Sequence, residues 1–154
     1  MTRVEEVMSS FELIATSDKA RAGVLHTPNG DVPTPVFVPV ATQASVKTVT
    51  PSELRQVGAT MLLGNTYHLY LRPGIDTMRN MGGLAKFMGW DGPTLTDSGG
   101  FQAYSLGSRV EVKDGGLQFQ SHLDGKLHFF SAENVMAYQH AIGADFAMVL
   151  EISW

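Results

Sequence analysis

The segment with the clearest chemical potential is PTLTDSGGFQ, residues 93–102, in which a short apolar run ends in a carboxylate. A carboxylate at the end of a buried strand loses part of its hydration, which favours the protonated acid, whereas nearby donors favour the anion. Ser98 supplies a hydroxyl donor, and the amides of Gly99 and Gly100 supply two more. Asp97 could therefore serve as a nucleophile or as a general base.

The residues that follow Asp97 suit the binding of a planar ring. Gly99 and Gly100 carry no side chains, so a flat ligand could approach the backbone closely. Phe101 offers a face for stacking, and Gln102 offers both a donor and an acceptor. This combination predicts a pocket for an aromatic heterocycle such as a nucleobase. The structural alternative is that Asp97 caps the turn after its strand and the two glycines form that turn, and Asp-Ser-Gly-Gly alone is a weak pattern.

Four apolar segments, separated by helical patterns, are positioned to carry these groups. The predicted strands are residues 36–40, 61–64, 94–97 and 146–151. Such alternation predicts a parallel sheet with crossover helices. It fits half of an eight-stranded barrel or an open doubly wound sheet, since a complete barrel needs about 250 residues.

Local patterns predict the remaining elements. Capping and turn residues indicate helices at 50–58 and 131–143, a weaker helix at 75–83, a hairpin around Asn29, and an antiparallel meander at 108–130. Residues 65–74 are expected to form a polar-aromatic loop. We assign residues 1–154 to a single unit, with a hairpin region at 1–35 and the first half of a barrel at 36–154.

Polar side chains follow the predicted strands, and in both architectures the active site lies at the carboxyl ends of the strands. Asn65 follows the second strand, Asp97 ends the third, and Glu151 ends the fourth. Away from these ends, the sequence RPG at 72–74 predicts a turn, although Arg72 could meet a phosphate, as could Lys47.

Composition excludes several classes of protein. With 44% hydrophobic and 17% charged residues in 154, the chain is expected to fold. Its net charge of -4 and the lack of a Lys/Arg cluster mean that any nucleic-acid contact needs a local patch.

The absence of cysteine excludes disulfides and thiolate metal sites and agrees with a cytoplasmic protein. No apolar run approaches the roughly 18 residues that span a membrane, so no membrane partner is expected. No metal site is expected from the histidines, which show no ligand spacing: His68, His122, His128 and His140.

Four segments closely resemble the N-terminal half of the tRNA-guanine transglycosylases, the queuine tRNA-ribosyltransferase family. They are TPVFVPVATQASVKTVTPSEL, GATMLLGNTYHLYLRPG, GGLAKFMGWDGPTLTDSGGFQAYSL and VKDGGLQFQSHLDGKLHFFSAE. The resemblance runs from about Arg21 to Met148, and GNTYHLYLRPG followed by LTDSGGFQ is highly specific. It implies an α/β fold, a partial (β/α)8 TIM-type barrel of about four parallel strands, with an N-terminal hairpin and an inserted meander.

The resemblance also implies a reaction, in which guanine at the tRNA wobble position is replaced by queuine or a 7-deazaguanine precursor in the queuosine pathway. One aspartate attacks the ribose anomeric carbon and expels guanine, and a second aspartate moves protons as the new base attacks. Asp97 matches the second aspartate. Ser98 and its neighbours would hold the base, Phe101 would stack on it, and Asn65 would lie near the ribose. The implied partners are tRNA and a guanine-type base.

The chain departs from the family pattern in ways that matter for activity. The nucleophilic aspartate, the zinc site of three cysteines and one histidine, and much of the tRNA-binding surface belong to the missing C-terminal half. No cofactor is therefore expected in this chain. The fourth strand of the family ends in Asp-Glu-Cys, whose first Asp reads the base edge, whereas this chain has Glu151, Ile152 and Ser153. Glu151 would take the place of that Asp in binding the base, with one more methylene and therefore a different reach. We expect this change ahead of Trp154 to mark a truncation, a frameshift or an alternative end, and we expect the isolated chain to be inactive.

Two alternatives to an active enzyme fragment remain open. The chain could be an inactive truncated form or an interaction module that pairs with a full-length family member. A related enzyme acting on DNA or archaeal tRNA ranks lower, because SHLDG and NTYHLYLRPG resemble the bacterial and eukaryotic queuosine type. A half-barrel would expose strand edges and an apolar inner face, so we expect marginal stability or self-association.

Overall fold

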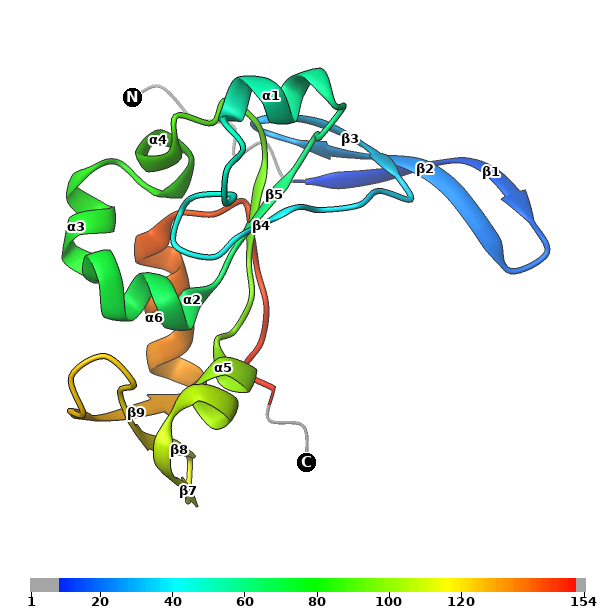
Figure 1. Ribbon diagram of the computed structural model, residues 1–154. Coiled ribbons are helices and arrows are strands. Elements are labelled where there is room, and N and C mark those ends of the chain that lie inside the picture. The colour runs from blue at the N-terminus through cyan, green and yellow to red at the C-terminus, as the bar shows by residue number, and fades with distance from the viewer. Residues whose placement is uncertain (1–8, 152–154) are drawn as a thin grey trace, which may run out of the picture.

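A four-stranded parallel sheet lies at the centre of the computed structural model, which describes residues 9–151 (Figure 1). Its order is β10-β6-β5-β4. The strand bounds are Val40–Ala41 for β4, Leu62–Gly64 for β5, Thr94–Thr96 for β6 and Phe146–Ala147 for β10. Each parallel strand lies beside the next one along the chain, as in a barrel, whereas a doubly wound sheet reverses direction partway. The α/β prediction is confirmed, and the strand order favours the partial barrel.

All four strands are shorter than predicted, β5 and β6 by one residue each and β4 and β10 by more. The expected strand at 36–40 pairs only at Val40–Ala41, apart from a bond of 3.0 Å from the Leu63 amide to the Pro39 carbonyl. Prolines interrupt this segment and donate no ladder bonds. The expected strand at 146–151 pairs only over β10, because its neighbour β6 ends at Thr96 and the chain turns at Asp97.

Helices cover one face of the parallel sheet. In Figure 1, α2, α3, α4 and α6 all lie on the same side of the parallel strands. The helical elements are α1 Pro51–Gln56, α2 Thr66–Leu69, η1 Tyr70–Gly74, α3 Ile75–Asn80, α4 Leu84–Met88, α5 Gly100–Leu106 and α6 Ala132–Ile142. Among residues 9–151, no helix is long and apolar enough to cross a bilayer.

The predicted helix caps are confirmed. Thr50 and Glu53 form a reciprocal capping box at the start of α1, with Pro51 in the first turn. Ser131 accepts from the Asn134 amide at the start of α6, and Asn134 caps the Ser131 amide in return. Gly143 ends α6 in the left-handed conformation, with φ of 70°.

The prediction of a loop at 65–74 is wrong, because this segment is mostly helical. Asn65 is extended and precedes α2, and the Thr66 amide at its first turn donates to the Asp97 carboxylate at 2.9 Å. Tyr67 and Leu69 are fully buried. This short helix is therefore stabilised by contacts distant in sequence, and the extended backbone at Arg72 interrupts the helical run that follows.

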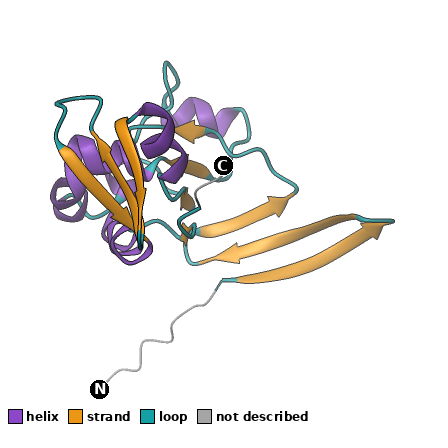
Figure 2. Ribbon diagram, turned by 90° about the horizontal axis from the view of Figure 1, so that it is seen from below, coloured by secondary structure: helices purple, strands orange, loops and turns teal. Residues whose placement is uncertain are grey.

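Two antiparallel sheets flank the parallel sheet, as predicted. The N-terminal sheet contains β1 Ser10–Ser17, β2 Ala20–Thr27 and β3 Gly30–Thr34, and it extends away from the rest of the molecule (Figure 2). The meander contains β7 Ser108–Lys113, β8 Gly116–Gln120 and β9 Leu127–Ser131. Asp145 ties the N-terminal sheet to β6, because it accepts from the Asn29 side chain at 2.6 Å and from the Thr94 amide at 2.8 Å.

The core of the molecule is divided into three clusters. The cluster nearest the carboxyl ends of the strands joins the meander to α2, α5 and α6 and contains Tyr67, Ala103, Leu117, Phe119, Phe130 and Val135. A second lies among α2, α3, α4 and α6, and a third lies under α1. The first cluster supports the segment that carries Asp97 and its neighbours.

Candidate functional site

Asp97 follows the end of β6, and four donors hold its carboxylate. Oδ1 accepts from the backbone amides of Thr66 at 2.9 Å and Gly99 at 3.1 Å. Oδ2 accepts from the side-chain amides of Asn65 at 2.5 Å and Gln102 at 3.2 Å. The donors come from the start of α2, the turn after β6, and α5, so three segments converge on one carboxylate.

The parallel pairing of β5 and β6 produces this convergence. The Asp97 amide donates to the Gly64 carbonyl at 3.3 Å, and the Thr66 hydroxyl donates to the Asp97 carbonyl at 2.5 Å. Because neighbouring parallel strands end at the same edge, the polar residue after β5 meets the carboxylate after β6. Asn65 itself is buried, with 7% of its surface exposed, so its side chain is fixed beside Asp97.

Close backbone packing fixes the turn after Asp97. Gly99 has φ of 74°, and a Cβ at this position would lie 2.7 Å from the Tyr67 amide nitrogen. A Cβ at Gly100 would overlap the Glu151 carbonyl oxygen. Ser98 accepts from the Gly100 amide at 3.3 Å. The turn that was the structural alternative for this segment is therefore present, with Asp97 and Ser98 capping it and the glycines forming it. In the same turn, Oδ2 of Asp97 faces side chains.

Phe101 and Glu151 lie outside the hydrogen-bonded group. The ring of Phe101 is 70% exposed at the start of α5 and is free of a covering side chain on most of its surface. Glu151 is exposed, and no hydrogen bond joins its side chain to another residue within 9–151. Its backbone carbonyl packs against Gly100. Ile152 and Ser153, where the sequence departs from the family pattern, lie outside the described residues.

A tyrosine and two histidines lie beside the site, although the sequence analysis weighed the histidines only as metal ligands. The buried Tyr67 hydroxyl lies 2.7 Å from His122 Nδ1, and the His68 and His122 rings are 5.9 Å apart. Burial and the neighbouring His122 lower the pKa of His68, against an opposing effect of Asp97. His68 is thus a neutral imidazole at neutral pH. The position of Tyr67 and His68 directly after a strand end was the available sequence clue.

The chain does not supply the donors of the family's zinc site. Within the part that the structure describes, no three histidine or carboxylate side chains gather to hold a metal. Three thiolates cannot come from a chain without cysteine. The chemistry available at the site is therefore that of a carboxylate, two side-chain amides, backbone amides and a neutral imidazole.

A parallel sheet of barrel order, with a multiply hydrogen-bonded carboxylate at its carboxyl edge, is typical of an α/β barrel-type protein and makes that edge the candidate site. The family model described as Queuine tRNA-ribosyltransferase matches residues 16–153. The chain belongs to this family.

Curated relatives agree with the family match. The chain is 58% identical over 135 residues to the queuine tRNA-ribosyltransferase of Pelotomaculum thermopropionicum, covering 88% of this chain and 36% of that protein. It is 55% identical over 143 residues to that of Desulforudis audaxviator, covering 92% and 38%. The chain therefore spans little more than a third of the length of these relatives.

Proposed function

We propose that this chain carries the acid/base and base-binding part of a tRNA-guanine exchange site and needs a complementing segment for turnover. The observation that carries the proposal is the Asp97 carboxylate, held by four donors at the edge where β5 and β6 end. In this role Asp97 moves protons to and from the departing or entering base, and the nucleophile that attacks ribose comes from outside these 154 residues.

The two oxygens of Asp97 differ in a way that suits this role. Oδ1 accepts from two backbone amides, whose positions are fixed by the fold. Oδ2 accepts only from side-chain amides, which can rotate. Gln102 is the more distant donor on Oδ2, at 3.2 Å. A guanine N–H can therefore displace Gln102 and bind Oδ2 while the carboxylate stays in place. We assign proton transfer to Oδ2 and positioning to Oδ1.

The surroundings of Asp97 support a flat heterocycle as the ligand. The exposed Phe101 ring supplies an apolar face close to the glycine turn. Asn65 and Gln102 each carry a carbonyl oxygen and an amide group, which match the mixed donors and acceptors of a purine edge. In the proposed exchange, guanine leaves and queuine or a 7-deazaguanine precursor enters the same pocket of a tRNA-bound site. The exposed carboxylate of Glu151 is the further group that we assign to the edge of the base.

Guanine binding by the purified 154-residue chain tests the assignment. Equilibrium dialysis with labelled guanine should detect binding that Asp97→Asn weakens about tenfold, the size expected for losing a charge-assisted hydrogen bond. The matched control is Asp114→Asn, an exposed turn residue of the meander, which should bind guanine as the unaltered chain does. Equal guanine affinities for the unaltered chain and Asp97→Asn would contradict the proposal.

Exchange of labelled guanine into tRNA tests the need for complementation. The chain alone should incorporate no guanine, because the family resemblance assigns only one of the two catalytic aspartates, Asp97, to these residues. Adding the remaining C-terminal segment of the Pelotomaculum thermopropionicum relative should restore exchange, and Asp97→Asn in the chain should reduce it by about 100-fold or more. Guanine exchange by the chain alone would refute the proposal that the nucleophile comes from a complementing segment.

A second candidate function is an interaction module that pairs with a full-length family member. The observation that favours it is exposure of large apolar side chains beside both edge strands, with Phe37 82% and Val149 75% exposed. Co-expression with a tagged full-length relative should recover the chain in a stoichiometric complex. Recovery of the relative without the chain would remove this candidate.

A further inference from the structure

A cavity of about 650 Å³ lies on the helical side of the molecule, away from Asp97. Its walls come from η1, α3, the connection between β8 and β9, and α6. None of the residues that hydrogen-bond the Asp97 carboxylate lines it. The cavity is therefore a separate feature that the proposed exchange chemistry does not use.

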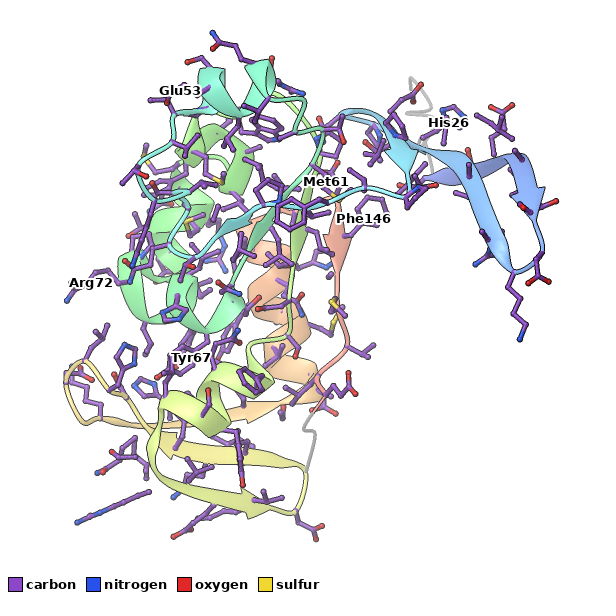
Figure 3. All side chains as sticks on the ribbon, turned by 45° about the vertical axis from the view of Figure 1, so that its right-hand side comes forward. His26, Glu53, Met61, Tyr67, Arg72 and Phe146 are labelled. Carbon is purple, nitrogen blue, oxygen red and sulfur yellow. The ribbon has the colours of Figure 1, made fainter. Side chains whose placement is uncertain are left out.

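Basic groups outnumber acidic groups around this cavity. Arg72, Arg79 and Lys126 line it together with two carboxylates. Arg79 pairs with Asp76 at 2.9 Å, and Lys126 pairs with Asp124 at 3.2 Å. Within residues 9–151, no carboxylate lies within 4.0 Å of the Arg72 guanidinium. Arg72, which points away from the parallel sheet in Figure 3, is thus available for an anion.

A buried ring nitrogen also lacks a partner at the cavity wall. His128 Nδ1 lies 3.0 Å from the Tyr70 hydroxyl, whereas His128 Nε2 is buried and has no hydrogen-bond partner among the described residues. Buried polar atoms are rarely left unpaired in native proteins. Burial lowers the pKa of His128, so the ring is neutral and adds no charge to the cavity wall.

Two phenol rings form the aromatic part of the wall. The Tyr70 and Tyr138 rings lie 4.7 Å apart with an interplanar angle of 34°. Burial raises the pKa of Tyr70 to about 12, so this phenol stays uncharged and does not repel an anion. The cavity volume lies within the range of small-molecule sites, about 300–1,000 Å³, and exceeds what a bare phosphate fills.

We propose that this cavity binds a nucleotide, with its phosphate on Arg72 and its base or ribose against Tyr70 and Tyr138. An arginine guanidinium binds phosphate through parallel N–H donors, and aromatic side chains stack on bases without regard to sequence. The nucleotide comes either from a free mononucleotide or from one unit of a single-stranded RNA. The proposal does not depend on the role given to Asp97.

Calorimetric titration of the 154-residue chain tests this site with three probes: inorganic phosphate, uridine 5′-monophosphate and a pentauridylate. Uridine probes avoid the guanine pocket proposed at Asp97. Arg72→Gln should weaken uridylate binding about tenfold, as expected for loss of a charge-assisted phosphate contact. Arg109→Gln, which makes the same charge change at an exposed residue of β7, should leave binding within about twofold. Far-UV circular dichroism verifies that both variants stay folded.

The three probes distinguish a free nucleotide from an RNA strand as the ligand, and they also define the results that would overturn the proposal. Binding of the monophosphate identifies a free nucleotide as a sufficient ligand, and binding of pentauridylate alone identifies an RNA strand, so both support the proposal. Phosphate binding as tight as uridylate binding would overturn the nucleotide assignment. Equal weakening by Arg72→Gln and Arg109→Gln, or no binding of any probe, would overturn the site itself.

Discussion

Gly99 combines two constraints at a single residue of the candidate site. Its backbone has φ of 74°, and a Cβ would lie 2.7 Å from the Tyr67 amide nitrogen. Gly125, in the meander, has φ of 70° and no atom within 4 Å of a Cβ position. Both glycines need a left-handed backbone, but only Gly99 lacks room for a Cβ, so comparing the two separates the effect of backbone conformation from that of close packing.

We predict that Gly99→Ala lowers the free energy of unfolding more than Gly125→Ala. The left-handed backbone alone costs an alanine about 1–2 kcal/mol, which both variants share. Overpacking against backbone at Gly99 adds roughly 1–3 kcal/mol. Urea unfolding followed by circular dichroism measures both values. Equal losses for the two variants would mean that the turn after Asp97 has room that the structure does not show.

The titration of His68 gives a second prediction for a single residue. Burial lowers its pKa below the ordinary value of 6.5, with a further contribution from His122. Between the lowered pKa and 6.5, the unfolded chain binds more protons than the folded chain. The contribution of His68 to stability is therefore complete above pH 6.5 and is lost as the pH falls through the folded pKa.

We predict that His68→Gln flattens the loss of stability on the acid side of pH 6.5, measured by urea unfolding at a series of pH values. The control is His26→Gln. Hydrogen bonds to Asp31 and Glu12 raise the pKa of His26, so its contribution is complete below 6.5 and is lost as the pH rises through the folded pKa. His26→Gln should leave the acid-side slope unchanged. An acid-side slope unaffected by His68→Gln would contradict the neutral state of this partly buried ring.

Among the elements, α6 and the strand edge at β10 are joined by one side chain. Gln139 is buried on α6, accepts from the Thr96 hydroxyl at 2.9 Å and from the Met148 amide at 3.0 Å, and donates to the Met148 carbonyl at 2.8 Å. The segment after β10 has only a single ladder bond to β6 at this point, from Met148 to Thr96. Gln139 therefore fixes the chain that leads to Glu151.

We predict that Gln139→Leu lowers the free energy of unfolding by about 1–3 kcal/mol, because it leaves the Met148 carbonyl without a partner among the described residues and removes one of the two hydrogen bonds of the Met148 amide. Gln56→Leu, at an exposed position of α1, should change it by no more than about 0.5 kcal/mol. Denaturant unfolding compares them. A loss for Gln139→Leu no larger than that for Gln56→Leu would show that the segment after β10 is held by other contacts.

At the scale of the whole molecule, the parallel sheet has two open edges. The order β10-β6-β5-β4 leaves β4 and β10 without outer neighbours among the described strands. Large apolar side chains beside them are exposed, including Phe37 and Val149. Exposed strand edges and contiguous apolar surface both favour association.

We predict that the purified chain self-associates, with a light-scattering mass that rises above that of a monomer as concentration increases. Phe37→Ser combined with Val149→Ser should shift this rise to higher concentration. Val57→Ser removes an apolar side chain that is 78% exposed at the end of α1, away from the strand edges, and should not shift it. A monodisperse monomer with a sharp two-state melt would refute the prediction.

Local chemistry accounts for the elements that were predicted correctly. The capping box at Thr50, the cap at Ser131 and the turn at Asn29 act over a few residues, so their residue types suffice to predict them. The helix at Thr66–Leu69 was missed because its first amide is satisfied by Asp97, 31 residues away. The length of β4 was missed because prolines interrupt the ladder before Val40, and the length of β10 was missed because its neighbour β6 ends at Thr96.

The sequence by itself determined the family, the parallel α/β class and the position of Asp97 at the end of a strand, because each depends on residue order along one segment. Only the tertiary structure decided which groups surround that carboxylate. Asn65, Thr66, Gly99 and Gln102 converge on it because β5 and β6 end side by side. The tertiary structure alone also placed Arg72 beside His128 and two tyrosines, since that cavity is formed by elements brought together across more than 60 residues of chain.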